Sequence, residues 1–129
     1  MAWVLVEREQ FVRMCEKVGV SQIVRDFIRA WAPSVSRYEI PSQKLIYRSP
    51  NNRYEAWSAR IPNPESNKGK SGGYRLVFFL DMQTTTINLD FIEKRNNLGY
   101  KNEGHHRKDE YNKYVSGVKK ELEKRDSTL

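Results

Sequence analysis

The sequence predicts an α+β fold in which a small antiparallel sheet of three to four strands carries an N-terminal helical hairpin and a C-terminal helix. Apolar residues recur at helical spacing near both ends of the chain. Between them, apolar runs of strand length are separated by proline, glycine and asparagine. The 129 residues can bury a core without help from disulfides, so we expect a single domain over residues 1–129.

The N-terminal third predicts two amphipathic helices. The apolar stretch from Met1 to Val6 fits either a first strand or the lead into a helix. From Arg8 to Val18, and again from Ser21 to Trp31, apolar side chains fall on one helical face. Gly19 between them is a plausible C-cap, and Pro33 ends the second segment. We therefore expect a helical hairpin that lies on the sheet.

The middle of the chain predicts the strands. The stretch from Ser34 to Arg53 is punctuated by proline and asparagine, and it holds one possible short strand at Lys44–Arg48. Tyr54–Ile61 alternates between apolar and polar residues, as a strand does. Tyr74–Leu80 is nearly all apolar, which is typical of a central strand covered on both faces. After a tight turn, Thr84–Ile92 completes a hairpin.

The last part of the chain predicts a helix that begins near Asp109. Tyr111, Val115, Val118 and Leu122 recur there at helical spacing. Lysines near its end suit the negative pole of a helix.

Composition limits the partners and the compartment. The net charge of +7 indicates an acidic partner, which can be nucleic acid, an acidic protein or a membrane surface. Cys15 is the single cysteine, so a disulfide framework within one chain is excluded. The sequence has no apolar run long enough to span a membrane, and Glu7 and Glu9 interrupt any signal peptide. We expect a soluble cytoplasmic protein that does not bind a membrane.

Two apparent motifs can be set aside. Gly69-Lys70-Ser71 looks like the end of a phosphate-binding P-loop, but Pro64 stands where the leading glycine is needed, and the lysine precedes a strand. His105 and His106 are adjacent, and no cysteine or carboxylate cluster with ligand spacing surrounds them. We therefore expect neither a metal site nor a cofactor.

A set of cationic residues gathers around the predicted hairpin, accompanied by tyrosines. Its members are Arg60, Lys68, Lys70, Arg75, Lys94 and Arg95, with Tyr74, Tyr100 and Tyr111. The loop before one strand and the end of the next lie at the same end of an antiparallel pair, so these charges can converge on one anion. Such a set suits phosphodiester chemistry, in which positive charge stabilises a pentavalent phosphate and a lysine or tyrosine moves protons. The alternative is a solvated basic rim.

These residues also carry a family resemblance. The run Ser71 to Phe79, preceded by the strand Tyr54–Ile61 and followed by a strand ending in Lys94-Arg95 and a helix, resembles the RelE/ParE superfamily of toxins from bacterial toxin-antitoxin modules. The resemblance is to the RelE/HigB-like mRNA interferase branch. It implies a ribosome-dependent mRNA endonuclease that inhibits translation. It also implies metal-independent attack of the ribose 2′-hydroxyl on the phosphodiester, and an acidic antitoxin as partner.

The resemblance assigns roles to individual residues. Arg75 and Arg95 match the two family arginines that hold the scissile phosphate, Lys68 and Lys70 lie in the region of its lysines, and Tyr111 is the candidate tyrosine. Further RNA-contacting candidates are Arg60, Lys94, Tyr100, His105 and Arg107. The last three lie in an insertion from Asn96 to Lys108, where Tyr100 is an alternative tyrosine and His105, His106 or Arg107 an alternative source of acid or base.

Two other functions remain open from the sequence. A ParE-like toxin would act on DNA gyrase and cleave nothing, but such toxins typically lack the catalytic set, so the presence of Arg75 and Arg95 counts against it. A non-toxic basic module of the same fold would bind nucleic acid without cutting it.

Overall fold

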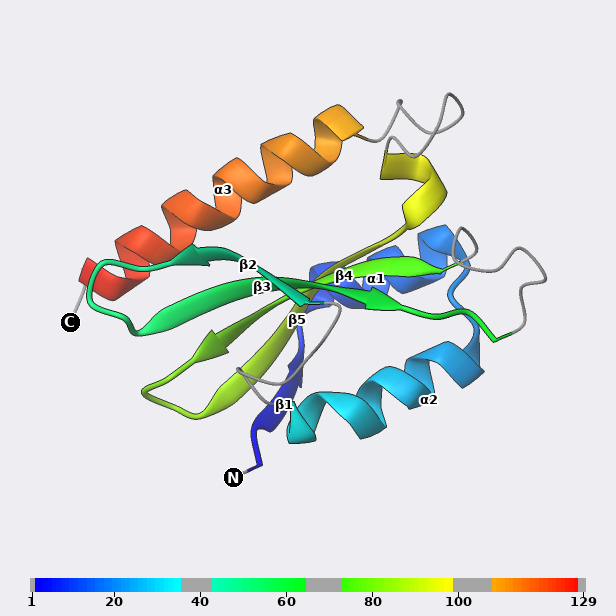
Figure 1. Cartoon of the computed structure of the whole chain (residues 1–129), viewed down its shortest axis with the longest axis horizontal. Helices are drawn as coiled ribbons and strands as arrows, with labels where there is room; N and C mark the ends of the chain where they lie inside the picture. Colours follow the sequence, from blue (N-terminus) through cyan, green and yellow to red (C-terminus); the bar gives the residue numbers. More distant parts are fainter. Residues whose placement is uncertain (1, 36–42, 65–72, 99–107, 128–129) are drawn as a thin grey trace.

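Five strands form one sheet in the computed structural model, which describes residues 2–35, 43–64, 73–98 and 108–127. The strands are β1 (Val4–Glu7), β2 (Gln43–Arg48), β3 (Tyr54–Ile61), β4 (Tyr74–Asp81) and β5 (Thr86–Lys94). Their order across the sheet is β1-β5-β4-β3-β2. Figure 1 shows helices on both faces of this sheet. Two edge strands, β1 and β2, thus flank the meander of β3, β4 and β5.

The sheet departs from the expected one in strand number and in direction. It has five strands, not three to four, and β1 pairs with β5 in parallel, whereas the other neighbours are antiparallel. The stretch from Met1 to Val6, for which the sequence left a strand or a helix lead open, contains β1: Leu5 packs on the core and its backbone aligns with Ile87. The optional strand at Lys44–Arg48 is β2. Sequence spacing alone could not reveal a pairing between segments so far apart along the chain.

The hairpin of β4 and β5 agrees closely with its prediction. β4 is central, and all its side chains are buried except the half-buried Arg75, as expected of a strand covered on both faces. β5 begins at Thr86, two residues later than expected, because Thr85 adopts a positive φ of 55° within the turn. At Asp90 the register between β4 and β5 shifts, so that Asp90 and Phe91 both face the same side.

Two helices, α1 (Glu9–Val18) and α2 (Gln22–Trp31), form where the apolar spacing predicts them. Gly19 ends α1 with a φ of 79°, and the Ser21 hydroxyl accepts a hydrogen bond from the first turn of α2. The expected N-terminal hairpin is nevertheless wrong, because β1 precedes both helices. α1 packs on β5, and α2 continues into the short helix η1 (Ala32–Ser34).

The main core lies between the sheet and the layer of α1 and α2. Its fully buried side chains include Phe11, Val24, Ile28, Leu76, Phe78, Leu89 and Ile92. Every second residue of β4, and every second residue of β3 from Trp57 on, packs into it, which follows from the alternation of side chains along a strand. The opposite set of side chains therefore has to face the remaining helix.

The last helix, α3 (Lys108–Ser127), lies on the other face of the sheet (Figure 1). Only Val118, Leu122 and Asp126 are buried along its 20 residues. Before it, a short helix, η3 (Arg95–Leu98), follows directly from β5. None of the described helices has the length and apolar character needed to cross a membrane. This face of the molecule is thus far more polar than the α1/α2 face, and the candidate site lies on it.

Candidate functional site

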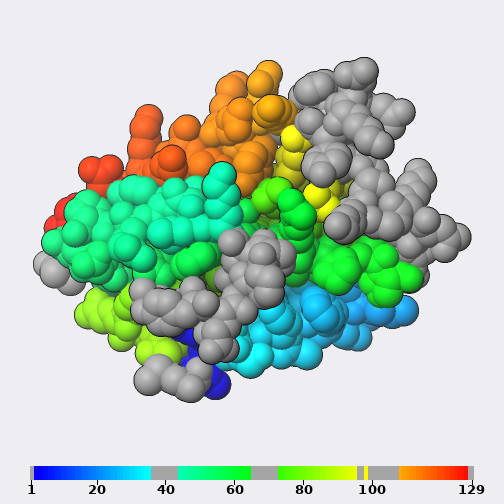
Figure 2. All heavy atoms as spheres, viewed as in Figure 1, coloured from blue at the N-terminus to red at the C-terminus, as the bar shows by residue number. Residues whose placement is uncertain are grey.

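A cleft with a volume of about 780 Å³ lies between the first turns of α3, η3 and the α3-facing side of the sheet. We call it the cationic cleft. It is lined by Lys44, Leu45, Ile46, Ser58, Arg60, Arg75, Arg95, Leu98, Lys108, Tyr111, Asn112, Val115 and Lys119. In Figure 2 the surfaces of α3 (orange) and β2 (teal) adjoin each other, with η3 (yellow) beside them. The lining includes six cationic residues and, among the described residues, no carboxylate.

Strand alternation brings two of the arginines together. Ala59 and Ile61 of β3 belong to the main core, so Arg60 between them faces the opposite side. Arg60 stands directly opposite Arg75 of β4. Like charges in directly opposed positions of an antiparallel pair are destabilising. Arg75 stands opposite the buried Glu93 of β5 on its other side, so one of the two guanidinium groups has a carboxylate beside it, and a bound anion would further offset their repulsion.

The arginines differ in how far they are fixed. Arg95 has only 6% of its surface exposed and is held by its backbone, whose N–H donates to the Gly73 carbonyl at 3.1 Å. Arg75 is half-buried, and its Nη1 donates to the Ser58 hydroxyl at 2.8 Å. Arg60 is exposed. The buried Arg95 and the hydrogen-bonded Arg75, together with the exposed Arg60 at the rim, suit the binding of a phosphate that enters from solvent.

Tyr111 approaches the same arginines from the first turn of α3. Its ring packs on Phe91, with centroids 5.5 Å apart. Burial raises the pKa of the Tyr111 phenol, and the charge of Arg75 and a hydrogen bond with Ser58 oppose this rise. The phenol is therefore protonated at neutral pH. It can serve as a proton donor, whereas a role as base would require its deprotonated form.

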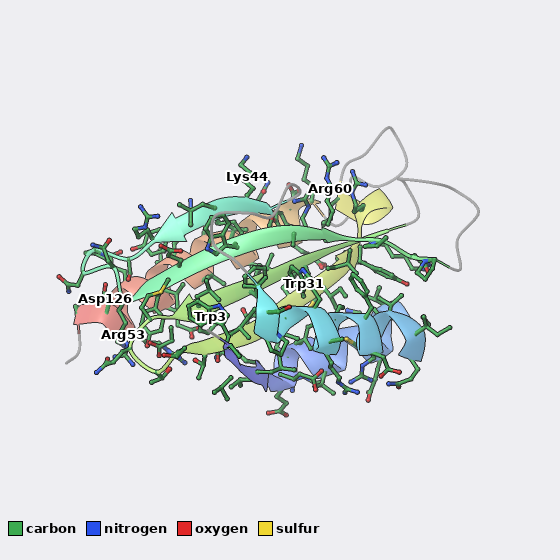
Figure 3. All side chains as sticks on the ribbon, turned by 60° about the horizontal axis from the view of Figure 1, so that its bottom comes forward. Trp3, Trp31, Lys44, Arg53, Arg60 and Asp126 are labelled. Atoms are coloured by element: carbon green, nitrogen blue, oxygen red, sulfur yellow. The ribbon has the colours of Figure 1, made fainter. Side chains whose placement is uncertain are left out.

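Three lysines of the lining were missed by the sequence reasoning. Lys44 lies on β2 and stands opposite Ser58, while Lys108 and Lys119 lie on α3. Figure 3 shows the side chains of Lys44 and Arg60 extending from neighbouring strands toward the same side of the sheet. Lys119 could have been found, because it follows Tyr111 by two helical steps of four residues and so shares its face. Lys44 could not, because the position of β2 depends on sheet pairing.

The predicted site residues fall into three groups. Arg60, Arg75, Arg95 and Tyr111 come together in the cationic cleft. Lys94 does not line it: Lys94 is exposed and pairs with Tyr74, a residue of the main core, so it belongs to the other face. The remaining predicted residues lie outside the described part of the chain: Lys68, Lys70, Tyr100, His105, His106 and Arg107.

Among the described residues, no group of three or more His, Cys, Asp or Glu side chains is placed to hold a metal ion. The cationic cleft itself offers guanidinium, ammonium, hydroxyl and amide groups. The guanidinium and ammonium groups bind anions, and the described lining has no carboxylate, histidine or thiol to hold a metal ion.

A second cleft of about 580 Å³ lies farther along α3, and we call it the paired cleft. Its lining consists of Arg8, Glu9, Gln10, Arg13, Asp90, Tyr114, Gly117, Val118 and Glu121. Arg8 bridges Asp90 at 3.0 Å and Glu121 at 3.3 Å, and the Tyr114 hydroxyl donates a hydrogen bond to Asp90. Here the positive charges meet carboxylates of the same chain.

Comparison of the chain with protein-family models, with curated proteins and with solved structures finds no match. Any function assigned to the cationic cleft therefore has to be argued from the residues of this chain.

Proposed function

We propose that the protein is an endoribonuclease that binds an RNA phosphodiester in the cationic cleft. The observation that supports this best is the convergence of Arg60, Arg75, Arg95 and Tyr111 from β3, β4, η3 and α3 on one cleft whose described lining has no carboxylate. Guanidinium groups match the geometry of phosphate oxygens and hold them with paired hydrogen bonds. The lysines of the rim extend the positive surface along which an RNA backbone can run.

The chemistry that fits these groups is transfer of the phosphoryl group to the neighbouring ribose hydroxyl. The 2′-oxygen attacks the phosphorus and loses its proton to a base, the bond from phosphorus to the 5′-oxygen breaks, and that oxygen takes up a proton. The products are a 2′,3′-cyclic phosphate and a free 5′-hydroxyl. DNA lacks the attacking hydroxyl and would not be cut.

The described residues fill two of the roles in this step. Arg75 and Arg95 stabilise the charge that gathers on the phosphate oxygens in the transition state. Tyr111, protonated at neutral pH because burial raises the pKa of its phenol, gives the proton to the 5′-oxygen. The sequence hypothesis gives the role of base to Lys68 or Lys70, both outside the described residues.

The natural substrate, on this proposal, is messenger RNA on the ribosome, as the resemblance to RelE/HigB-like toxins implies. A ribosome would hold the message in place, so an open cleft of this size suffices for the nuclease. An acidic antitoxin that covers the cationic cleft would neutralise the toxin, because opposite charge favours such an association.

Induced expression followed by primer extension on a reporter message, with and without translation, tests the proposal. We expect cuts that appear only during translation, growth arrest with the parent protein, and neither with Tyr111→Phe. Tyr114→Phe is the matched control, because it removes a hydroxyl one turn away that faces Asp90 of the paired cleft. Intact RNA with stalled replication would instead indicate a gyrase-directed toxin, and an absence of both cleavage and arrest would leave a binding module.

A further inference from the structure

Phe91 is a buried residue of β5 that the proposed mechanism does not use, and it packs against two tyrosines of α3. Its exposed surface is 6%. Its ring stacks on that of Tyr114, with centroids 4.5 Å apart and planes inclined by 23°. The Tyr111 ring lies against it at 5.5 Å with an angle of 59°. Tyr111 lines the cationic cleft and Tyr114 lines the paired cleft, so Phe91 contacts a wall residue of each.

An extra residue in β5 decides which side of the sheet Phe91 faces. Leu89 and Phe91 are two residues apart in β5, yet their partners in β4 are adjacent, so Asp90 between them forms a β-bulge. Leu89 belongs to the main core, and regular alternation would return Phe91 to that core. The bulge turns Phe91 toward α3 instead, and the alternation resumes with Ile92 in the main core. Bulges beside functional sites often redirect a side chain in this way.

The position of the Tyr111 hydroxyl depends on the contact with Phe91. The buried side chains of α3 all lie in its second half, from Val118 on, and within residues 108–117 every side chain is exposed or half-buried. A tyrosine in a helix has more than one common rotamer about its Cα–Cβ bond. A change of rotamer would carry the Tyr111 ring away from Phe91, and the hydroxyl at the tip of the ring would move farthest. The contact therefore favours the rotamer in which Tyr111 lines the cationic cleft.

We propose that Phe91 is a positioning residue that selects the rotamer of Tyr111 and so keeps the tyrosine hydroxyl in the cationic cleft with Arg75. Phe91 suits this role because it is itself fixed. Its backbone belongs to the sheet, and its second aromatic contact, Tyr114, is hydrogen-bonded to Asp90. The effect on catalysis rests on the proposed function, whereas the choice of rotamer does not.

The hairpin of β4 and β5 carries both the ring that orients the proton donor and the guanidinium group that holds the phosphate. Phe91 stands opposite Val77, and Arg75 lies two residues before Val77 on the same face of β4. Tyr111 comes from α3, but its ring is placed by this hairpin. The proton donor and Arg75 are therefore held relative to one rigid element, as a reaction that depends on orientation requires.

The test is NMR of the full chain with labelled aromatic residues, in which scalar couplings across the Cα–Cβ bond of Tyr111 report its rotamer. The parent should show the couplings of a single rotamer. Phe91→Leu removes the ring but keeps a buried apolar side chain, and it should show couplings averaged between rotamers. In RNA cleavage its kcat should fall by about tenfold with little change in KM, because orientation and not binding is lost. Phe91→Tyr keeps the ring and should keep the parental couplings and kcat.

Phe79→Leu is the matched control. Phe79 is another buried phenylalanine on the α3-facing side of the sheet, where its ring contacts Tyr54 at 6.1 Å between centroids. This variant should lower the melting temperature and leave the Tyr111 couplings unchanged. If Phe91→Leu does not fold, Phe91→Met takes its place with the same expected result, because methionine adapts to irregular space in a core.

Single-rotamer couplings in a folded Phe91→Leu or Phe91→Met chain would overturn the proposal. Averaged couplings in Phe79→Leu as well would also overturn it, because any loss of packing beneath α3 would then release Tyr111. Averaged couplings confined to the Phe91 variants, in a protein whose parent cuts no RNA, would support the positioning by Phe91 and reject the proposed function.

Discussion

The cationic cleft and the paired cleft both lie along α3, but they differ in whether their cationic lining residues meet carboxylates in the same cleft. In the paired cleft Arg8 meets Asp90 and Glu121 of its own chain. In the cationic cleft, six cationic residues line the wall and none of the described lining residues is a carboxylate. Charges that meet carboxylates in the same cleft serve the structure of the chain, whereas the cationic lining of the other cleft suits an anionic ligand.

The difference has a structural basis in how α3 is attached. Tyr114 donates to Asp90 and stacks on Phe91, and near the end of the helix Asp126 accepts from the backbone N–H of Asn51 at 2.7 Å. These contacts hold the middle and the end of α3 (Figure 3 labels Asp126 at its far end). The first turns, which carry Lys108 and Tyr111, can therefore border an open cleft without being pulled onto the sheet.

The largest expected effect comes from the cationic cleft. Arg75→Ala should lower RNA cleavage by about 10²- to 10³-fold, because it removes a preorganised donor to the phosphate. The melting temperature is measured alongside, because the variant removes the repulsion with Arg60 but also the cation opposite the buried Glu93. Purified protein is assayed on a translated message. Arg13→Ala, in an exposed pair with Glu9, is the control and should leave cleavage unchanged. Comparable losses in the two variants would remove the distinction between the clefts.

A change in the paired cleft should act on stability instead. Asp90→Ala should lower the free energy of unfolding by about 3 kcal/mol, because it leaves Arg8 and Tyr114 without their buried acceptor. Urea unfolding followed by circular dichroism measures this. Glu121→Ala removes a partner with 39% side-chain exposure and should cost less than about 1 kcal/mol. Equal costs would mean that burial of Asp90 does not matter.

Local sequence patterns predicted individual strands and helices, but not how distant segments pair. The alternation in Tyr54–Ile61 and the apolar run from Tyr74 correctly located β3 and β4, and both helices before them were found by spacing. The parallel pairing of β1 with β5 was missed, because a four-residue strand carries no mark of its distant partner. The bulge at Asp90 was missed for a similar reason, since it is a property of two strands together.

The residues of the candidate site also fall into those that local sequence geometry predicted and those that depend on pairing between distant segments. Arg75 and Arg95 were predicted to converge because they flank a hairpin, and hairpin geometry is local. Lys44 and Ser58 required knowledge of how β2 pairs with β3, and the paired cleft required the placement of α3 on β5. Lys94 was predicted together with Arg95 because the two are adjacent, although Lys94 ends β5 opposite the core residue Tyr74 and Arg95 begins η3.

A smaller effect should distinguish two neighbouring lysines of α3. Lys119 lines the cationic cleft and Lys120 does not. We plot the logarithm of the affinity for single-stranded RNA against the logarithm of the salt concentration. The slope should be smaller in magnitude by about 0.7 in Lys119→Ala than in the parent, as expected for the loss of one phosphate contact. Fluorescence anisotropy over a salt series measures it. Lys120→Ala should keep the parental slope, and an equal loss in both variants would indicate a diffuse basic surface.

The smallest effect concerns acid stability at the turn between β4 and β5. Burial by itself would raise the pKa of Asp81, but hydrogen bonds from Arg53, Thr84 and Gln83 outweigh it, and the pKa lies below its usual 3.8. A carboxyl whose pKa is lowered by folding adds stability above its unfolded pKa and loses it as the pH falls through the folded value.

Asp81→Asn should therefore be less stable than the parent at pH 7 and should show a weaker loss of stability as the pH falls below 3.8. Thermal unfolding across a pH series measures both. RNA cleavage at neutral pH should be retained, because Asp81 does not line the cationic cleft. If parent and variant lose stability equally as the pH falls, another carboxyl group governs the acid stability.

The most direct measurement for the cationic cleft is an NMR titration of the ¹⁵N-labelled chain with a short single-stranded RNA in which every 2′-hydroxyl is methylated to prevent cleavage. We expect the amide signals of Ser58, Arg60, Arg75, Arg95 and Tyr111 to shift together, while those of Gln10, Gly117 and Glu121 in the paired cleft stay in place. Shifts centred on the paired cleft, or an absence of shifts at Arg75 and Arg95, would contradict the assignment of the phosphate site.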